Sequence, residues 1–400
     1  MNILFLTLSR FTSLNDRGIY PDLVRKFCRE GHQMYVVAPM ERKFKKQGGL
    51  FREENLTLIK IKTLNLQQSG VIEKGLAYLM LEFQFKQAIK KYLSKVRFDL
   101  VLYSTPPINI TKAVEYVKKR DNSTTYLLLK DIYPQAAVDD GIFDGNGHIY
   151  KYFRRQEKKL YHLSDYIGCM SQANVDYLIM HNPEIPLNKL EVNPNSIEPL
   201  EVPVQDFEKD AFRKKHGIPE DALILIYGGN LGKSQGIEFY LDIMKMKAGD
   251  ERFFFIAVGS GSAFGQIKRF INENKIANAL LISYLPKQEF DVMVALSDVG
   301  LVFLNSYFTV PNFPSRMLSY MDQKKPVLAA TDKVTDLGNI ITENKFGYWS
   351  LHGDMESFNK NLELLFKNKS ELSHMGQIAN QFLQKHFNVD VSFQLIESKI

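Results

Sequence analysis

The chain has 400 residues, of which 45% are hydrophobic and 24% are charged, and its formal net charge is +6. This length is too great for one ordinary core and the composition excludes fibrous and disordered classes, so we expect two globular domains of nearly two hundred residues. The two cysteines, Cys28 and Cys169, exclude a disulfide framework and are expected to be reduced core residues.

The apolar runs of this sequence are short. None approaches the roughly 20 residues that span a bilayer, and the N-terminus lacks a basic region followed by a long apolar stretch. We therefore expect a cytoplasmic protein. The eight histidines lack the paired spacing of zinc ligands. This favours a mechanism without a metal, although it leaves a loosely held magnesium ion open.

The first half of the chain alternates between apolar strands and helical patterns. A buried-type strand at 2–8 is followed by a polar loop, a helix from about 19 to 30 that Gly31 closes, and a strand at 33–38. Such alternation predicts a parallel, doubly wound sheet. Further strands are expected near 57–62, 99–103, 124–130 and 165–170.

Basic residues concentrate in the same half. The clusters 42–46 and 151–159 are of the kind that attracts anionic surfaces, so we consider contact with an anionic membrane. Solvated helix faces explain the clusters equally well. The segment 72–92 carries an apolar stripe at helical spacing, which we expect to pack in the core rather than against lipid. The stripe consists of Leu76, Leu79, Met80, Phe83 and Ile89.

A segment rich in proline and asparagine at 193–199 is the best candidate for a linker, because these residues continue neither a strand nor a helix. The sequence therefore predicts two doubly wound, Rossmann-like α/β domains, at 1–200 and 201–385. Residues 386–400 are expected to form a helix that packs back on the N-terminal domain. Strands of the second domain are expected near 222–227, 252–258, 279–283, 298–303 and 326–330.

A glycine-rich turn at 228–236 follows the first strand of the second half. Its glycines let backbone amides approach an anion, the following helix N-terminus adds partial positive charge, and Lys233 supplies a full charge. A tight turn without a ligand is the alternative interpretation. We favour a phosphate-binding turn.

Three other loops follow strands of the second half, where parallel sheets bind their ligands. In the third of them a helix is expected to begin near Ser315, so that its free amides and Arg316 can meet a diphosphate. In the second loop, Tyr284 and Leu285 can line a flat pocket for a base. In the first loop, Gly259 and Gly261 let the backbone press against a ligand. The third loop is the segment 310–321.

Counting residues argues against two familiar phosphate motifs. The segment 232–234 ends like a P-loop, but that motif needs a glycine where Tyr227 stands. The glycine pair at 259–261 lacks a third glycine at the spacing of a dinucleotide fingerprint, and no acidic residue ends the strand near Ser283. The sequence therefore disfavours both an NTPase and a dehydrogenase.

The order and spacing of these segments resemble those of GT-B glycosyltransferases of family 4, the nucleotide-sugar enzymes that build bacterial polysaccharides such as lipopolysaccharide and capsule. The resemblance covers essentially the whole chain. Each matching segment is modest, and the set together is specific. The segments are residues 2–6, 31–32, 36–37, 129–134, 194–196, 229–233, 314–316 and 325–327.

The resemblance implies a GT-B fold, with two domains facing across a cleft, and retaining transfer of a hexosyl or N-acetylhexosaminyl group from a nucleoside-diphosphate sugar to a saccharide acceptor. It implies no cofactor, no metal and no nucleic acid. Lys233 and Arg316 would stabilise the departing diphosphate. Donor contacts carried over by position are Gly229, Asn230, Gly232, Ser234, Gly259, Gly261, Tyr284, Leu285, Asn312, Pro314, Ser315 and Ser319.

Two departures from the family pattern bear on catalysis. The family usually carries two glutamates eight positions apart, and the matching positions here are Pro311 and Ser319. The usual arginine and lysine of the first donor loop are also replaced, by Asn230 and Gln235. Lys233 is the cation that remains in that loop.

Candidate acceptor residues lie after strands of the N-terminal half. Asp131 follows an apolar strand at its ligand end, which suits an acid/base or acceptor-orienting residue, and a cap on the next turn is the alternative. Lys130 precedes it in the matching segment. Asp16, Arg17 and Gly18 follow the first strand, where they either line the acceptor site or form a surface loop.

The function predicted from the sequence is glycosyl transfer to a lipid-linked acceptor at the inner face of the plasma membrane, in surface polysaccharide assembly. Because both usual glutamates are missing, a non-catalytic sugar-nucleotide-binding or scaffolding protein stays open as an alternative. A nucleotide-sugar epimerase of the same fold is the third candidate.

Overall fold

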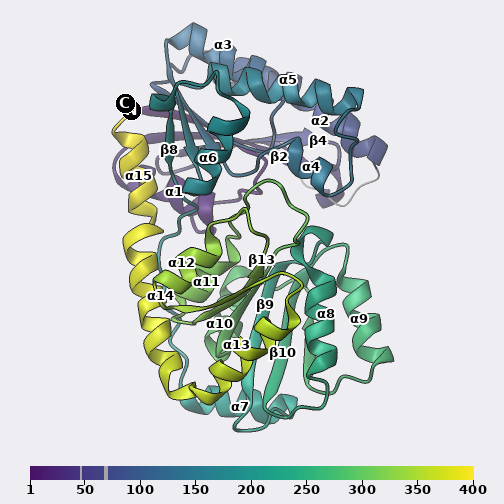
Figure 1. Cartoon of the computed structure of the whole chain (residues 1–400). Helices are drawn as coiled ribbons and strands as arrows, with labels where there is room; N and C mark the ends of the chain where they lie inside the picture. Colours follow the sequence, from purple (N-terminus) through teal and green to yellow (C-terminus); the bar gives the residue numbers. More distant parts are fainter. Residues whose placement is uncertain (46, 67–70) are drawn as a thin grey trace. The chain divides into compact units, whose positions relative to one another are not determined.

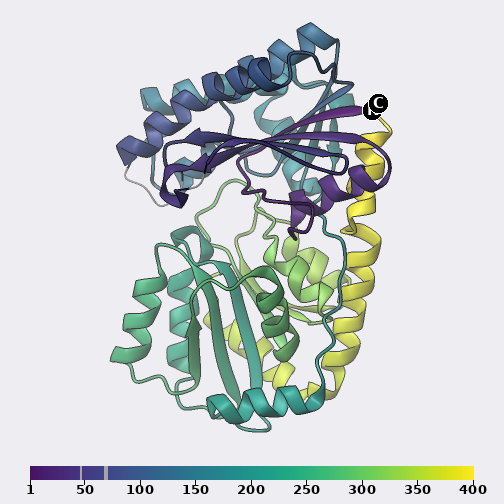
Figure 2. The same cartoon turned by 180° about the vertical axis from the view of Figure 1, so that it is seen from behind.

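The computed structural model describes residues 1–45, 47–66 and 71–400, and the side chains of Val71, Ile72, Lys74 and Lys233 also lie outside the description. The chain divides into two compact units. Unit 1 comprises residues 1–198 and 388–400, and unit 2 comprises residues 199–387. Each is an α/β fold (Figures 1 and 2), as the sequence predicts.

Unit 1 is built on a sheet that has eight strands within the described residues, in the order β3-β4-β2-β1-β5-β6-β7-β8. All neighbours are parallel except the hairpin of β3 and β4. The strand order reverses between β1 and β5. The strands are β1 (Asn2–Leu6), β2 (Gln33–Glu41), β3 (Gly49–Glu53), β4 (Leu56–Thr63), β5 (Leu100–Ser104), β6 (Thr124–Leu129), β7 (Tyr166–Cys169) and β8 (Leu190–Val192).

Helices cover both faces of this sheet. On one face lie α2, α3 and α5 (Figures 1 and 2), and on the other α1 packs against α15. Helices and 3-10 turns of unit 1 are α1 (Ile19–Arg29), η1 (Arg42–Phe44), α2 (Val71–Tyr92), α3 (Thr111–Asp121), α4 (Gln135–Asp139), α5 (His148–Leu163), α6 (Gln172–His181), η2 (Leu187–Lys189) and α15 (Val389–Glu397). Of the basic cluster 42–46, Lys46 lies outside the described residues.

The end of the chain is part of unit 1. Phe393 of α15 packs against Phe27 of α1, with ring centroids 4.9 Å apart. Ser392 donates to the side-chain oxygen of Asn193 at 2.6 Å, so the proline- and asparagine-rich segment is tied to α15. Cys28 and Cys169 are free and buried.

Helix α2 is apolar on two faces, and this corrects one prediction. Four residues of the expected core stripe are exposed, and only Ile89 is buried. The buried face carries Ala77, Leu81, Phe85, Ala88 and Ile89 instead, while the exposed residues are Leu76 (50%), Leu79 (57%), Met80 (46%) and Phe83 (65%). Helical spacing identifies a common face but does not tell which of two apolar faces meets the sheet.

Unit 2 holds a parallel sheet of six strands within the described chain, in the order β11-β10-β9-β12-β13-β14, which reverses between β9 and β12. The strands are β9 (Leu223–Asn230), β10 (Phe253–Ser260), β11 (Ala279–Ile282), β12 (Val299–Phe303), β13 (Val327–Thr331) and β14 (Gly347–Leu351). Its helices and 3-10 turns are α7 (Asp206–His216), η3 (Lys233–Gln235), α8 (Ile237–Met246), α9 (Phe264–Glu273), α10 (Lys287–Leu296), α11 (Arg316–Asp322), α12 (Leu337–Glu343), α13 (Met355–Lys367), η4 (Lys369–Glu371) and α14 (Leu372–His386).

The expected strands are all present, and three strands were not expected. These three, β3, β8 and β14, lie at sheet edges, where burial is partial and the apolar pattern is weak. In the part of the chain that the structure describes, no helix combines the length and the apolar character that a membrane span requires.

Candidate functional site

The glycine-rich turn lies at the point where the strand order of unit 2 reverses. Strand β9 ends in Gly229 and Asn230, both exposed. The neighbouring strand β12 leads to Asn305, whose N–H donates to the carbonyl of Ser234 at 3.3 Å. Ligands of open α/β sheets bind outside the carboxyl ends of the strands at such a reversal. The turn is therefore placed where this fold binds ligands.

Arg316 is held across this turn from the first position of α11. Its Nη2 donates to the carbonyl of Asn230 at 3.2 Å and to the side-chain oxygen of Gln235. Its guanidinium carbon lies 4.6 Å from the ring centroid of Tyr227. Its buried Nη1 has no hydrogen-bond partner among the described residues. A fixed cation thus lies beside the end of β9, the kind of group that anion sites use.

Sequence reasoning missed how Arg316 is positioned. The sequence marks Gln235 as a replacement for a lysine and Tyr227 as the residue that breaks a P-loop motif, yet both contact the guanidinium. The Tyr227 hydroxyl also donates to the carbonyl of Gln235 at 3.0 Å, which links the two supports. Their closeness to the glycine turn is the one sequence signal that could have marked them.

Lys233 is the first residue of η3, and its side chain lies outside the described residues. Its role as the cation of the turn stays a prediction. Of the other turn residues, Gly232 is buried and Ser234 is partly buried.

Gly259 and Gly261 pack against the end of β9. A Cβ on Gly259 would lie 1.9 Å from the carbonyl oxygen of Gly229, and one on Gly261 would lie 2.3 Å from that of Leu231. These glycines are thus required by the backbone of the turn itself. Their predicted contact with a nucleoside stays a prediction.

We expect Gly259→Ala to destabilise unit 2 by about 3 kcal/mol or more, because the methyl group would meet backbone that has no room to move. Gly265→Ala is the matched control, since its Cβ would meet only the end of the Arg269 side chain at 4.0 Å. Denaturant unfolding of the two variants checks this. An unfolding free energy of Gly259→Ala equal to that of wild type would contradict it.

The remaining predicted donor residues are spread along the carboxyl edge of the sheet. Tyr284 is 69% exposed and, with Leu285, follows β11, two strands away from β9. The carbonyl of Asn312 accepts from the Thr335 hydroxyl at 2.7 Å. Pro314 is partly buried, Ser315 is exposed directly before α11, and Ser319 is buried within it. The segment around Arg316 thus lies nearer to the strand reversal than the loop of Tyr284.

In unit 1 the strand reversal lies between β1 and β5. The hydroxyl of Ser104 donates to that of Thr7 at 3.2 Å, which joins the ends of these strands. The hydroxyl of Thr105 accepts from the backbone N–H of Lys130 at 3.0 Å and of Asp131 at 3.3 Å. The ends of β1, β5 and β6 are thereby joined, and Asp131 lies at this edge.

Asp131 carries a perturbed carboxyl group. Desolvation by surrounding protein raises its pKa to about 7, although the side chain itself reaches solvent. Burial raises the pKa of Tyr78 to about 12, and the negative charge of Asp131 contributes to this shift. A carboxyl group whose pKa is raised toward neutral suits acid/base chemistry.

The other predicted acceptor residues make contacts within unit 1. Asp16 accepts from the backbone N–H of Thr12 at 2.6 Å, and Arg17 donates to the carbonyl of Glu198 at 2.7 Å. Gly18 precedes α1 with a φ of 137°. These contacts order the loop, and a role toward an acceptor stays a prediction.

Lys130 is buried, and its ammonium donates to the carbonyl of Asn193 at 3.1 Å. Burial lowers its pKa to about 7, so the folded state binds fewer protons than the unfolded state between pH 7 and about 10.5. As the pH falls through that window, Lys130 therefore lowers the unfolding free energy by up to about 1.4 kcal/mol per pH unit.

We expect the unfolding free energy of Lys130→Met, relative to wild type, to be higher at pH 7 than at pH 10, because the variant has no ammonium to desolvate. Urea unfolding at both pH values measures the difference, with the exposed Lys95→Met as control. If the unfolding free energies of Lys130→Met and wild type differ by the same amount at both pH values, Lys130 is not desolvated in the folded state.

Among the described residues, no group of three or more histidine, cysteine, aspartate or glutamate side chains is arranged to hold a metal ion.

Comparison with known proteins shows what the second half of the chain resembles. Residues 208–382 match the family model described as "Glycosyl transferases group 1". The matched segment contains the glycine-rich turn and Arg316.

Two relatives and one solved structure extend the comparison. The chain is 23% identical over 329 residues to the probable glycosyltransferase WbjE of Pseudomonas aeruginosa, covering 82% of this chain and 80% of WbjE. It is 24% identical over 140 residues to WcaI of Escherichia coli K12, named a putative colanic acid biosynthesis glycosyl transferase, covering 34% and 33%.

The solved structure is that of Anabaena HepE in complex with UDP-glucose, with a TM-score of 0.70 and 15% identity over 100% of this chain and 99% of HepE. This likeness shows the fold, two Rossmann-like units of the GT-B type. The family match lies wholly within unit 2.

Proposed function

We propose that this chain is a retaining glycosyltransferase of family 4 that transfers a sugar from a nucleoside-diphosphate donor to a saccharide acceptor in surface polysaccharide assembly. Unit 2 binds the donor, and unit 1 binds the acceptor. The observation that carries the proposal is Arg316, a positioned cation whose buried Nη1 has no partner among the described residues, beside the glycine-rich end of β9.

Breaking the bond between the sugar and the diphosphate places negative charge on the leaving diphosphate oxygen. A guanidinium at a fixed position stabilises that charge without having to reorganise during the reaction. The exposed backbone of Gly229 and Asn230 offers a surface that a phosphate approaches closely. Lys233 adds a second positive charge in this proposal.

Asp131 acts on the acceptor in this proposal. A hydroxyl group that attacks the sugar must lose its proton, and a carboxylate that is ionised above about pH 7 accepts it. The hydroxyl groups of Thr105 and Ser104 fix the strand ends around it.

The donor and the pathway are proposed from the relatives. HepE is a protein solved with UDP-glucose, which makes UDP the first nucleotide to test. The name of WcaI refers to colanic acid biosynthesis, and WbjE is named a probable glycosyltransferase. We propose a hexosyl or N-acetylhexosaminyl donor, a lipid-linked acceptor, and a place in the cytoplasm at the inner face of the plasma membrane.

Thermal unfolding with UDP, GDP and dTDP tests donor binding. A nucleotide at 100 times its Kd stabilises the folded state by about 2.7 kcal/mol, and we expect one of the three to do so. Arg316→Ala should lose most of this stabilisation. If none of the three raises the unfolding temperature of wild type, the proposed donor class is wrong.

A second candidate is a non-catalytic sugar-nucleotide-binding protein. It is favoured by one observation, that Pro311 and Ser319 stand where the family usually carries glutamates. Radiolabelled UDP-sugars incubated with the purified protein and extracted membrane lipid separate the two. Transfer or donor hydrolysis that disappears in Arg316→Ala excludes the non-catalytic role.

A further inference from the structure

The outer face of α2 exposes four large apolar side chains in one row. Leu76, Leu79, Met80 and Phe83 are spaced three and four residues apart, and between 46% and 65% of each is exposed. We call these four residues the α2 ridge. Single exposed apolar residues are common on protein surfaces, but a contiguous row marks a contact with something apolar.

Basic residues surround the α2 ridge on the same side of the sheet. Helices α2, α3 and α5 together carry 13 lysines and arginines and 5 aspartates and glutamates, a net charge of +8, whereas the whole chain carries +6. The rest of the protein is therefore slightly acidic. Positive charge is concentrated on the three helices that cover one face of unit 1 (Figure 1).

Part of this charge is available to a partner. Within α5, Arg154 pairs with Glu157 and Lys158 pairs with Glu184. For Lys151, Arg155 and Lys159 of the same helix, all exposed or nearly so, no ion pair forms with any described residue. Two further large apolar residues, Ile149 (59%) and Tyr152 (41%), are exposed on α5 beside them.

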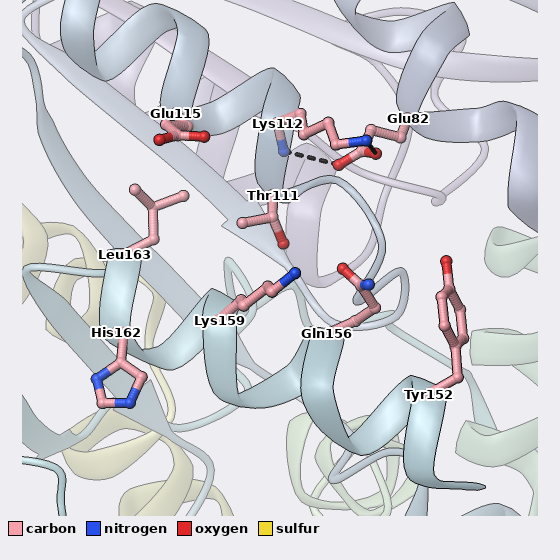
Figure 3. A pocket seen from close by; sticks show the side chains of 9 residues that line it. All are labelled: Glu82, Thr111, Lys112, Glu115, Tyr152, Gln156, Lys159, His162 and Leu163. Carbon is pink, nitrogen blue, oxygen red and sulfur yellow. Dashed lines mark hydrogen bonds and ion pairs between the residues drawn. The ribbon is translucent and has the colours of Figure 1, made fainter. Parts of the chain in front are cut away.

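A cavity of about 660 Å³ lies where the three helices meet, and Figure 3 shows the side chains that line it. Lys159 and Gln156 of α5 point toward Thr111 at the start of α3. The buried hydroxyl oxygen of Thr111 has no hydrogen-bond partner in the described part of the chain. Glu82 of α2 is occupied, because it accepts from the backbone N–H of Lys112 at 2.7 Å. The second carboxylate of the lining, Glu115, pairs with Lys119, so Lys159 and Thr111 are the donors that a phosphate group could meet here.

We propose that the α2 ridge and the basic surface of α3 and α5 form a docking surface for an anionic phospholipid bilayer. The ridge inserts among the acyl chains, the lysines and arginines contact the headgroups, and Lys159 with Thr111 binds one lipid phosphate in the cavity. This inference rests on the proposed function only in that a lipid-linked acceptor requires the enzyme at a membrane.

Charge decides between a bilayer and a second copy of this chain as the occupant. An apolar row alone fits either one. In a symmetric dimer two copies of this basic surface would face each other, and like charges in contact are repelled. An anionic bilayer instead combines an apolar interior with a negative surface, which matches both features of this face.

Sedimentation with vesicles tests the proposal on the full-length protein. We expect binding to vesicles of phosphatidylcholine and phosphatidylglycerol at 7:3, at least tenfold weaker binding to phosphatidylcholine alone, and loss of affinity with added salt. Phe83→Ser and Lys159→Glu should each weaken binding to the anionic vesicles about tenfold. Phe207→Ser is the matched control, because Phe207 is 70% exposed on α7 of unit 2, and it should bind as wild type does.

The same samples separate this proposal from the proposed function. Phe83 is exposed, so Phe83→Ser should keep the wild-type unfolding temperature and the wild-type stabilisation by UDP, a property of unit 2. Failure of anionic vesicles to bind wild type overturns the docking surface, and so does equal weakening by Phe207→Ser. A wild-type dimer that Phe83→Ser dissociates into monomers would assign the ridge to a second copy and also overturn it.

Discussion

Arg316→Ala is expected to lower kcat/KM for the nucleotide-sugar donor by about 10² to 10³-fold. The guanidinium lies at the strand reversal of unit 2 with Nη1 free of partners among the described residues, so it is the side chain best placed to meet the leaving diphosphate. Removing one preorganised donor from a developing oxyanion costs a factor of this size. Initial rates of donor consumption over a range of donor concentrations measure it.

Two further variants show whether the effect belongs to the position of the cation. Arg316→Lys keeps the charge but loses the fork that bonds to Gln235 and Asn230, so we expect an intermediate loss. Arg269→Ala removes an exposed arginine of α9 in the same unit and should leave the rate unchanged. If Arg316→Ala retains wild-type kcat/KM, the diphosphate is bound elsewhere.

Asp131→Asn is expected to lower kcat by about 10² to 10⁴-fold, the range of general acid-base catalysis, with little change in donor affinity. Donor affinity should hold because Asp131 belongs to unit 1 and the proposed donor residues belong to unit 2. The exposed Asp176→Asn on α6 is the control for loss of one negative charge. Single-turnover rates and calorimetric UDP binding separate the two effects.

The pH dependence of this reaction adds a second test of Asp131. The pKa of its carboxyl is raised to about 7, so the ionised form that accepts a proton from the acceptor increases as the pH rises through 7. We expect the wild-type rate to rise with pH up to about 8 and then to level off. If the rate of Asp131→Asn rises with pH over the same range, the titration belongs to another group.

Much of the fold could be predicted because the central strands of both sheets are largely buried. Strands such as β5 and β12 are buried at every position and nearly continuous in apolar residues, a pattern that can be recognised from the sequence alone. The edge strands β3, β8 and β14 escaped prediction because one of their sides is open and their pattern is mixed. The buried face of α2 could not be predicted for a similar reason. A helix with two apolar faces does not reveal in its sequence which face packs against the sheet.

The candidate site could be predicted in outline only. The glycine-rich turn, Arg316 and Asp131 could be named as candidates because they follow strands at the ligand edge. The supports that hold Arg316 could not be found, since the contact of Tyr227 with a residue 89 positions later in the sequence exists only in the folded chain. For Lys130, the sequence indicated an acceptor contact, while its buried ammonium is bonded to backbone.

The account is tested most directly by a crystal structure of the protein soaked with UDP, GDP or dTDP. It predicts the diphosphate of the nucleotide within hydrogen-bond distance of Arg316 Nη1 and of backbone amides in the turn 229–234. A nucleotide bound elsewhere at full occupancy, or a diphosphate that does not touch Arg316, would contradict the assignment of the donor site to the end of β9.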